Sequence, residues 1–197
     1  MERESSFAAG TAVKADDSLV TTDEALMLAC RDGSSSAFGE LFGRYRQAIW
    51  GYFRRRLPDP ARAEELAQDT FVAVLENATR YRPAALFRTY LYAIAFNLLS
   101  AERRRSARQA GEPLSGQIPA ALSIAADTSL WIRQAIGRLD EMDREVLMLR
   151  EFEELTYGEI AEVLQVPLGT VRSRLFRARM ELRRLLTPDA AGERRQS

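Results

Sequence analysis

Residues 155–186, LTYGEIAEVLQVPLGTVRSRLFRARMELRRLL, contain the clearest structural signal in the chain. Thr156 and Glu159 are spaced as a capping box, in which the Thr156 hydroxyl accepts a hydrogen bond from the Glu159 amide and the Glu159 carboxylate reaches back. A helix is therefore predicted to begin there. The turn at 165–169 is short, and Pro167 stands at or just before the next helical start, where its missing N–H costs nothing.

The final helix is predicted from Thr170 to about Leu186, and its two sides differ in chemistry. At about 100° per residue, one buried side collects Val171, Leu175, Ala178, Leu182 and Leu185. The opposite or flanking surface carries hydroxyl, aromatic and guanidinium groups, namely Arg172, Ser173, Phe176, Arg177 and Arg183. Such groups suit a helix-turn-helix recognition helix, which needs donors for guanine edges, an apolar contact for a thymine methyl and cations for phosphates. The alternative is a solvated arginine face on a bundle helix, and the capped helix, short turn and basic second helix together favour DNA.

Helical periodicity continues through most of the chain, so the predicted fold class is all-α, with two small helical domains joined by a flexible linker. We expect an N-terminal helical bundle at 23–106 and a C-terminal four-helix helix-turn-helix domain at 127–186. The linker is placed at 107–126, where Gly, Pro and Ser interrupt any helix. Residues 1–22 and 187–197 lack periodicity and are predicted to be a disordered extension and a tail.

Within the first domain, the sequence Leu57-Pro58-Asp59-Pro60 ends one helix and a new amphipathic helix follows. Its apolar side carries Ala63, Leu66, Ala67, Thr70, Phe71 and Val74. Its polar side is acidic and consists of Glu64, Glu65, Gln68 and Asp69. This polar side is either a surface that binds a basic partner or an ordinary solvated helix face. A further helix follows Pro83 and ends in the basic run ERRRSAR at 102–108.

The composition is that of a soluble protein. Hydrophobic residues make up 46% and charged residues 28%, and no run of about 18 uncharged apolar residues exists to span a bilayer. The N-terminus, MERESSFAAG, contains acids and lacks an apolar segment, so no secretory signal is expected and the chain is predicted to be cytoplasmic.

The formal net charge is zero, but the charges are segregated along the chain. Residues 101–108 contain four Arg and one Glu, and residues 156–197 contain eight Arg and five acids. Residues 127–155 contain four Arg and eight acids. Basic and acidic blocks therefore alternate and cancel, so the average does not argue against nucleic-acid binding.

Much chemistry is excluded because the sequence contains one cysteine, Cys30, and no histidine. An intrachain disulfide is impossible, and Cys/His zinc sites and His-based triads lack their residues. The sequence has no glycine-rich phosphate loop and no nucleophile with a base. We therefore expect no catalytic residue, no metal and no cofactor, and no enzymatic activity.

Residues 155–186 closely resemble the C-terminal domain of extracytoplasmic-function (ECF) sigma factors of the sigma-70 superfamily, whose pattern is roughly L-[ST]-Y-x-E-I-A-x-x-L-x-[IV]-P-x-G-T-V-[KR]-S-R-L-x-R-A-R. Residues 63–105, AEELAQDTFVAVLENATRYRPAALFRTYLYAIAFNLLSAERRR, resemble the family's N-terminal domain, with its FxxWLYxIAxN near the centre. Both occur in the family's order, so the resemblance covers about 23–186.

The resemblance implies a non-catalytic subunit that binds RNA polymerase core, recognises the minus 35 and minus 10 promoter elements and directs transcription initiation. Its N-terminal domain would bind the β′ clamp helices through Glu64, Glu65, Gln68 and Asp69. The same domain would open the minus 10 element, with Arg80, Tyr81, Arg82, Phe87, Arg88 and Asn97 on the melted strand. Duplex phosphates would be bound by Arg103, Arg104 and Arg105, although a solvated helix end also explains that run.

The resemblance places Thr170, Arg172, Ser173, Phe176 and Arg177 at the minus 35 major groove, with Arg177 expected to read bases. The implied partners are the polymerase clamp helices and β flap, promoter DNA and an anti-sigma factor, without membrane insertion. Tyr90 stands where the family usually has Trp, and Phe96 where a basic residue is common, and both keep a ring in or near the core. Asp140 replaces the usual Pro after Leu139 and is a competent N-cap.

The residues are also compatible with two other classes of protein. The first is an autonomous helix-turn-helix regulator that binds an operator as a dimer through its first block, and it should shift promoter DNA without polymerase. The second is a helical adaptor that binds only protein. Salt-dependent DNA affinity would exclude the adaptor, because each neutralised phosphate contributes to the salt dependence.

Overall fold

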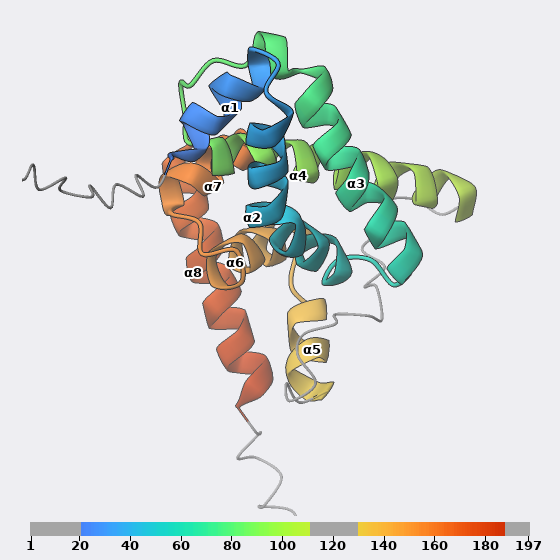
Figure 1. The fold of residues 1–197 in the computed structure, drawn as a ribbon. Coiled ribbons are helices and arrows are strands. Elements are labelled where there is room, and N and C mark those ends of the chain that lie inside the picture. The colour runs from blue at the N-terminus through green and yellow to red at the C-terminus, as the bar shows by residue number, and fades with distance from the viewer. Residues whose placement is uncertain (1–20, 111–129, 188–197) are drawn as a thin grey trace, which may run out of the picture.

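The computed structural model describes residues 21–110 and 130–187 (Figure 1). Within these ranges every regular element is a helix: α1 (Asp23–Arg31), α2 (Ser35–Arg54), α3 (Pro60–Glu76), the 3-10 helix η1 (Ala78–Arg80), α4 (Phe87–Ala110), α5 (Leu130–Gly137), α6 (Glu141–Glu151), α7 (Tyr157–Leu164) and α8 (Leu168–Leu186). The all-α prediction is confirmed. None of these helices combines the length and apolar character that crossing a bilayer requires.

The predicted domain boundaries differ slightly from the helix ends. α4 continues past position 106 to Ala110, so the expected linker begins inside a helix. Almost all of the predicted extension, linker and tail lie outside the described residues.

The N-terminal unit consists of α1 to α4, and its helix starts follow from local sequence. The hydroxyls of Thr22 and Ser34 each accept a hydrogen bond from an amide three residues later, at 3.2 Å, at the starts of α1 and α2. The Asp59 carboxylate accepts from the Ala61 amide at 2.9 Å, and Pro60 occupies the first turn of α3. These caps satisfy amides that have no partner inside a helix.

A cluster of rings fixes the junction before α4. Phe87 is fully buried, with its ring centroid 5.5 Å from that of Tyr45 and 6.3 Å from that of Tyr90. Tyr81 is also buried, 5.2 Å from Tyr90. Tyr90 and Phe96 are half-buried and pack against the core, as predicted for these two departures from the family pattern.

The capping predictions for the C-terminal unit, α5 to α8, are confirmed. The Thr156 Oγ1 accepts from the Glu159 amide at 3.3 Å, and the Thr156 amide donates to Glu159 Oε2 at 2.8 Å. Asp140 caps α6 by accepting from the amides of Met142 at 3.0 Å and Asp143 at 3.3 Å. Both helices therefore begin where their sequence signals place them.

The turn between α7 and α8 contains one residue in the left-handed backbone conformation. Gln165 has φ of 55°, a conformation that usually favours glycine, and the next amide, that of Val166, donates back to the Ala161 carbonyl at 3.0 Å. α8 begins at Leu168, immediately after Pro167. This confirms the expected role of Pro167, although the helix starts before the predicted Thr170.

The two units pack against each other, which the sequence did not predict. α7 lies along the start of α4 (Figure 1). Buried apolar side chains form one continuous core, which runs from Leu91 in α4 and Tyr52 in α2 to Val146 in α6 and Ile160 in α7. The helix-turn-helix is therefore supported by the N-terminal unit as well as by α5 and α6.

The capping box makes a measurable contribution to stability. We expect Thr156→Ala to lower the free energy of unfolding by about 1 kcal/mol, because the Glu159 amide loses its acceptor. Chemical denaturation followed by circular dichroism would measure it. Thr79→Ala is the control, since Thr79 is exposed, and it should change stability by less than about 0.5 kcal/mol. Equal effects of the two changes would contradict the capping role.

Candidate nucleic-acid interface

α8 presents one buried and one exposed face, as its sequence predicts. Val171, Leu175 and Ala178 are buried, while Leu182 and Leu185 are half-buried. The exposed face carries Arg172, Ser173, Phe176 and Arg177, and Phe176 is 67% exposed. Thr170 is half-buried and its carbonyl accepts from the Ser173 hydroxyl at 3.0 Å. The structure thus gathers the predicted groups on one accessible helix face.

Two arginines of α8 share one carboxylate of α6. Arg177 Nε and Nη2 each donate to Asp143 at 3.1 Å, and Arg174 Nη1 donates to the same carboxylate at 2.9 Å. The hydrogen bonds to Asp143 raise the pKa of Arg177. The Arg177 side chain nevertheless stays more than half exposed, so it is oriented without being covered. Sequence reasoning missed Asp143 because its contact with α8 depends on the packing of α6.

The residues predicted to bind DNA at the loop before α4 differ in exposure. Arg80, at the end of η1, and Arg82, on the loop, are both exposed, and Leu86 on the same loop is 55% exposed. Tyr81 and Phe87, whose rings the resemblance places on the melted strand, are buried in the core. Their rings instead fill the space beneath the loop.

Glu24 holds the first residue of α4 in place and was missed by sequence reasoning. Its Oε1 accepts a hydrogen bond from the Phe87 amide at 2.8 Å, which joins α1 to a helix start 63 positions away. A carboxylate at a helix N-terminus is favourable because it satisfies a free amide and faces the positive end of the helix dipole. No local sequence signal could have revealed this long-range cap.

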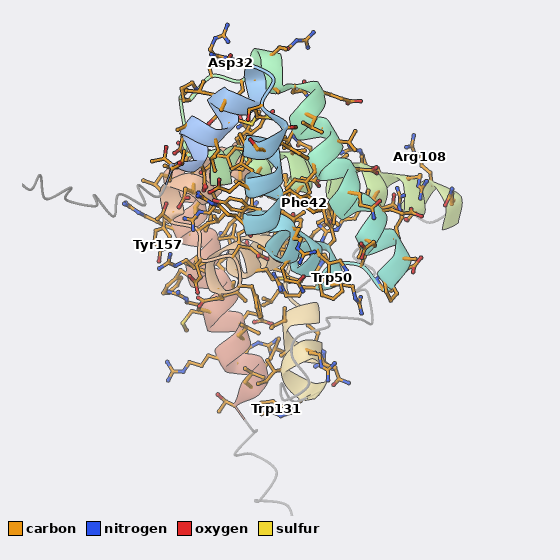
Figure 2. All side chains as sticks on the ribbon, in the orientation of Figure 1. Asp32, Phe42, Trp50, Arg108, Trp131 and Tyr157 are labelled. Carbon is orange, nitrogen blue, oxygen red and sulfur yellow. The ribbon has the colours of Figure 1, made fainter. Side chains whose placement is uncertain are left out.

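The remaining predicted residues of α4 are spread along the helix. Asn97 is exposed, about 15 Å along the axis from Phe87 at 1.5 Å per residue. Arg104 and Arg105 are exposed near the end that carries Arg108, which projects beyond the rest of the N-terminal unit (Figure 2). They therefore form a surface separate from the loop.

Two predicted DNA contacts of α4 are paired with carboxylates of the C-terminal unit. Arg88 Nη2 lies 2.7 Å and 2.9 Å from the two carboxylate oxygens of Glu159. Arg103 lies 2.9 Å from Glu141 and 3.6 Å from Glu145. Burial alone would raise the pKa of Glu159, but hydrogen bonds from Thr156 and Arg88 outweigh it and lower that pKa.

The acidic surface predicted on α3 is exposed, with Glu64, Glu65, Gln68 and Asp69 all accessible. Sequence reasoning missed two apolar side chains that extend it, Val72 and Leu75, which are 50% and 45% exposed. Because residues three, four and seven apart share a helix face, Gln68, Val72 and Leu75 form one strip. On the adjoining helix α2, Phe42 is exposed beside it and its ring lies 4.9 Å from Phe71 (Figure 2).

Among the described residues, no group of three or more Cys, Asp or Glu side chains is placed to hold a metal ion. Cys30 is buried, and burial raises the pKa of its thiol. The accessible chemistry is thus that of guanidinium, hydroxyl, aromatic and carboxylate groups. An exposed arginine and aromatic face on the second helix of a capped helix pair defines a helix-turn-helix DNA-binding protein.

Comparison with known proteins agrees with this class. Residues 41–109 match the family model "Sigma-70 region 2" and residues 129–182 match "Sigma-70, region 4". The chain is 33% identical to the RNA polymerase sigma-H factor of Pseudomonas aeruginosa over 84% of this chain and 94% of that protein. It is 31% identical to the ECF RNA polymerase sigma factor SigW of Bacillus subtilis over 79% of this chain and 92% of that protein.

Solved structures show the same fold. The structure of CnrH in complex with the cytosolic domain of CnrY matches with a TM-score of 0.66 at 28% identity, over 85% of this chain and 99% of that one. The sigma factor RpoE in complex with the anti-sigma factor NepR from Bartonella quintana matches with a TM-score of 0.63 at 22% identity, over 77% and 98%. The chain belongs to the ECF group of sigma-70 family RNA polymerase sigma factors. It therefore serves promoter recognition by RNA polymerase, as a non-catalytic initiation factor.

The Glu24 cap provides a test of how the loop before α4 is held. We expect Glu24→Ala to lower the free energy of unfolding by about 1–2 kcal/mol, because the half-buried Phe87 amide loses its acceptor. Hydrogen exchange at the Phe87 amide should accelerate in parallel. Glu76→Ala, at an exposed residue of α3, should leave both unchanged. Unaltered exchange in the Glu24 variant would show that the carboxylate does not cap α4.

Proposed function

We propose that this sigma factor reads the minus 35 element with α8, the minus 10 element with the loop before α4 and with α4 itself, and binds polymerase core through α3. The observation that carries the proposal is the exposed face of α8, which presents Arg172, Phe176 and Arg177 after a capped helix and a short turn. Such a face can supply donors and an apolar contact to a major groove.

At the minus 35 element, the structure supports different roles for neighbouring side chains. Arg177 is held by Asp143 yet exposed, so a bidentate contact with guanine would need little further ordering. Phe176 offers a ring to a thymine methyl. Thr170 and Ser173 lie in the first turns of α8, where hydroxyl and amide groups suit phosphate oxygens.

At the minus 10 element, Arg80 and Arg82 are exposed cations at the start of the loop, and Leu86 is an exposed apolar residue of the loop. Extruding a base costs a few kcal/mol, which stacking and pocket contacts offset by about 1–3 kcal/mol per base. We now assign Tyr81 and Phe87 to supporting the loop from within. Arg104 and Arg105 suit duplex phosphates, and Arg103 is proposed to join them once it leaves its carboxylate partners. Asn97 is proposed to contact the melted strand, as is Arg88 once it leaves Glu159.

For core binding, α3 exposes the acids Glu64, Glu65 and Asp69 beside the apolar side chains of Val72 and Leu75. We propose that it docks on the β′ clamp helices of polymerase, which would bury the apolar groups and pair the acids with basic residues. The C-terminal unit is proposed to face the β flap, and an anti-sigma factor is proposed to compete for these surfaces. The chain would act in the cytoplasm, where polymerase is, and nucleotide polymerisation belongs to that partner.

In vitro transcription from a promoter library with purified core tests the function. We expect initiation only when both core and this chain are present, and weak DNA binding without core. Glu64→Ala with Asp69→Ala should weaken core affinity by about tenfold, because two acids of the docking face are lost. Glu151→Ala with Glu154→Ala is the charge-matched control. Tight promoter binding without core would instead favour an autonomous helix-turn-helix regulator.

Base reading by α8 makes a second prediction. Arg177→Ala should relax specificity at one minus 35 base pair and cost about 1–3 kcal/mol in promoter binding by the holoenzyme. Arg184→Ala, at the far end of the same helix, removes the same charge and should leave base preference unchanged. Selection from a randomised minus 35 element measures both. Transcription that is indifferent to Arg177→Ala would contradict the groove assignment.

A further inference from the structure

One carboxylate of α6 binds two arginines of α8, the helix proposed to read the minus 35 element. Asp143 Oδ2 accepts a hydrogen bond from Arg177 Nε, and Asp143 Oδ1 accepts one from Arg177 Nη2, each at 3.1 Å. The same Oδ1 accepts from Arg174 Nη1 at 2.9 Å. Both oxygens of Asp143 are therefore engaged, and the carboxylate cannot turn without losing a partner.

Arg174 is the recessed partner of this carboxylate. The Arg174 side chain is 26% exposed, compared with 55% for Arg177 and 10% for Asp143. Arg174 Nη1 also lies 3.4 Å from Asp140, the residue that caps α6. Arg174 and Asp143 thus form a partly covered pair that joins the start of α6 to α8, and Arg177 is the most accessible side chain of the three.

The pairing with Asp143 uses one edge of the Arg177 guanidinium and leaves another. An arginine has five N–H donors in a planar fork, and Asp143 engages the edge formed by Nε and Nη2. The second hydrogen of Nη2 and one hydrogen of Nη1 point the same way at the tip of the side chain, and this terminal fork matches the O6 and N7 acceptors of guanine. Adenine presents an amino donor where guanine presents O6, so a fixed guanidinium discriminates between the two purines.

A carboxylate that fixes the guanidinium plane has two effects at a DNA surface. An arginine that is already ordered loses less conformational freedom on binding, so more of its interaction with guanine appears as affinity. The negative charge beside it also offsets the attraction to phosphates, which carry no sequence information. Asp143 is therefore suited to weaken general DNA affinity while it favours one base.

We propose that Asp143 is a positioning residue for minus 35 recognition, which holds the Arg177 guanidinium with its terminal fork available to a guanine and lowers affinity for DNA of other sequence. The proposal rests on the proposed function, because it deepens the role of Arg177 in base reading. An ordinary ion pair between α6 and α8 would contribute to stability alone and would leave base preference unchanged.

Asp143→Asn provides the test, in holoenzyme assembled with purified core. Binding is measured on promoters that carry each of the four bases at the minus 35 position where Arg177→Ala relaxes specificity. We expect the preference for guanine to fall by about fivefold, within the range that ordering one long side chain costs on binding, while affinity for the other three bases rises.

Asp140→Asn is the matched control. Asparagine caps a helix as well as aspartate does, and the variant removes the same charge one turn away in α6. It should raise affinity for all four bases equally and leave the preference for guanine as in wild type.

A double-mutant cycle with Arg177→Ala separates positioning from a structural role. In the Arg177→Ala background, Asp143→Asn should cause no further change in base preference, because the side chain that it positions is absent. A further change there would show that Asp143 acts by another route and would overturn the proposal. If the folding of Asp143→Asn is impaired, as judged by helical circular dichroism, Asp143→Ala replaces it with the same expectation, since alanine places no amide against the two guanidinium groups.

The outcomes separate this proposal from the proposed function. If Arg177→Ala relaxes specificity but the folded Asp143 variant keeps the guanine preference of wild type, the proposal is overturned and the groove assignment stands. A wild-type preference for a base pair other than G·C at that position would also overturn the proposal alone. If Arg177→Ala changes no base preference, the groove assignment and the proposal are both overturned.

Discussion

The pairing of Arg56 with Glu145 and Glu153 is the constraint on which the arrangement of the whole molecule depends. The arginine follows α2, and its two partners lie in α6 and in the loop after it, so a contact of about 3 Å brings the two halves of the chain together. Burial alone would raise the pKa of Glu145, but the nearby Arg56 and Arg103 lower it and keep the group ionised. The same burial makes each charge dependent on its partner.

Glu159 connects this global arrangement to local structure. One carboxylate completes the capping box that starts α7 and also receives the guanidinium of Arg88 from α4. The start of the helix-turn-helix is therefore in direct contact with the surface assigned to the minus 10 element. Asp143 likewise has two partners, because its carboxylate accepts hydrogen bonds from both Arg174 and Arg177 of α8. In this protein the carboxylates place the arginines, and the arginines are the groups suited to DNA.

Much of the site was predictable because its signals are local. The capping box, Pro167 and the two faces of α8 lie within 32 consecutive residues, and helix geometry alone orders them. The exposed acidic side of α3 follows from the same periodicity. The family resemblance places Tyr81 and Phe87 on the melted strand, yet their rings form an aromatic cluster with Tyr45. Position in a motif does not reveal which rings the core requires.

The sequence by itself determined most of the helices, the caps of α6 and α7, the family and the exposed face of α8, because these depend on residues a few positions apart. Only the tertiary structure decided which arginines are accessible and which are paired, since Arg88 and Glu159 are 71 positions apart and Arg56 and Glu153 are 97 apart. Electrostatic pairing depends on distance in space, and burial in a shared core gives these contacts their strength. The acidic residues of the C-terminal unit and the arginines of the N-terminal unit are far apart in sequence, and only the contact between the two units pairs them.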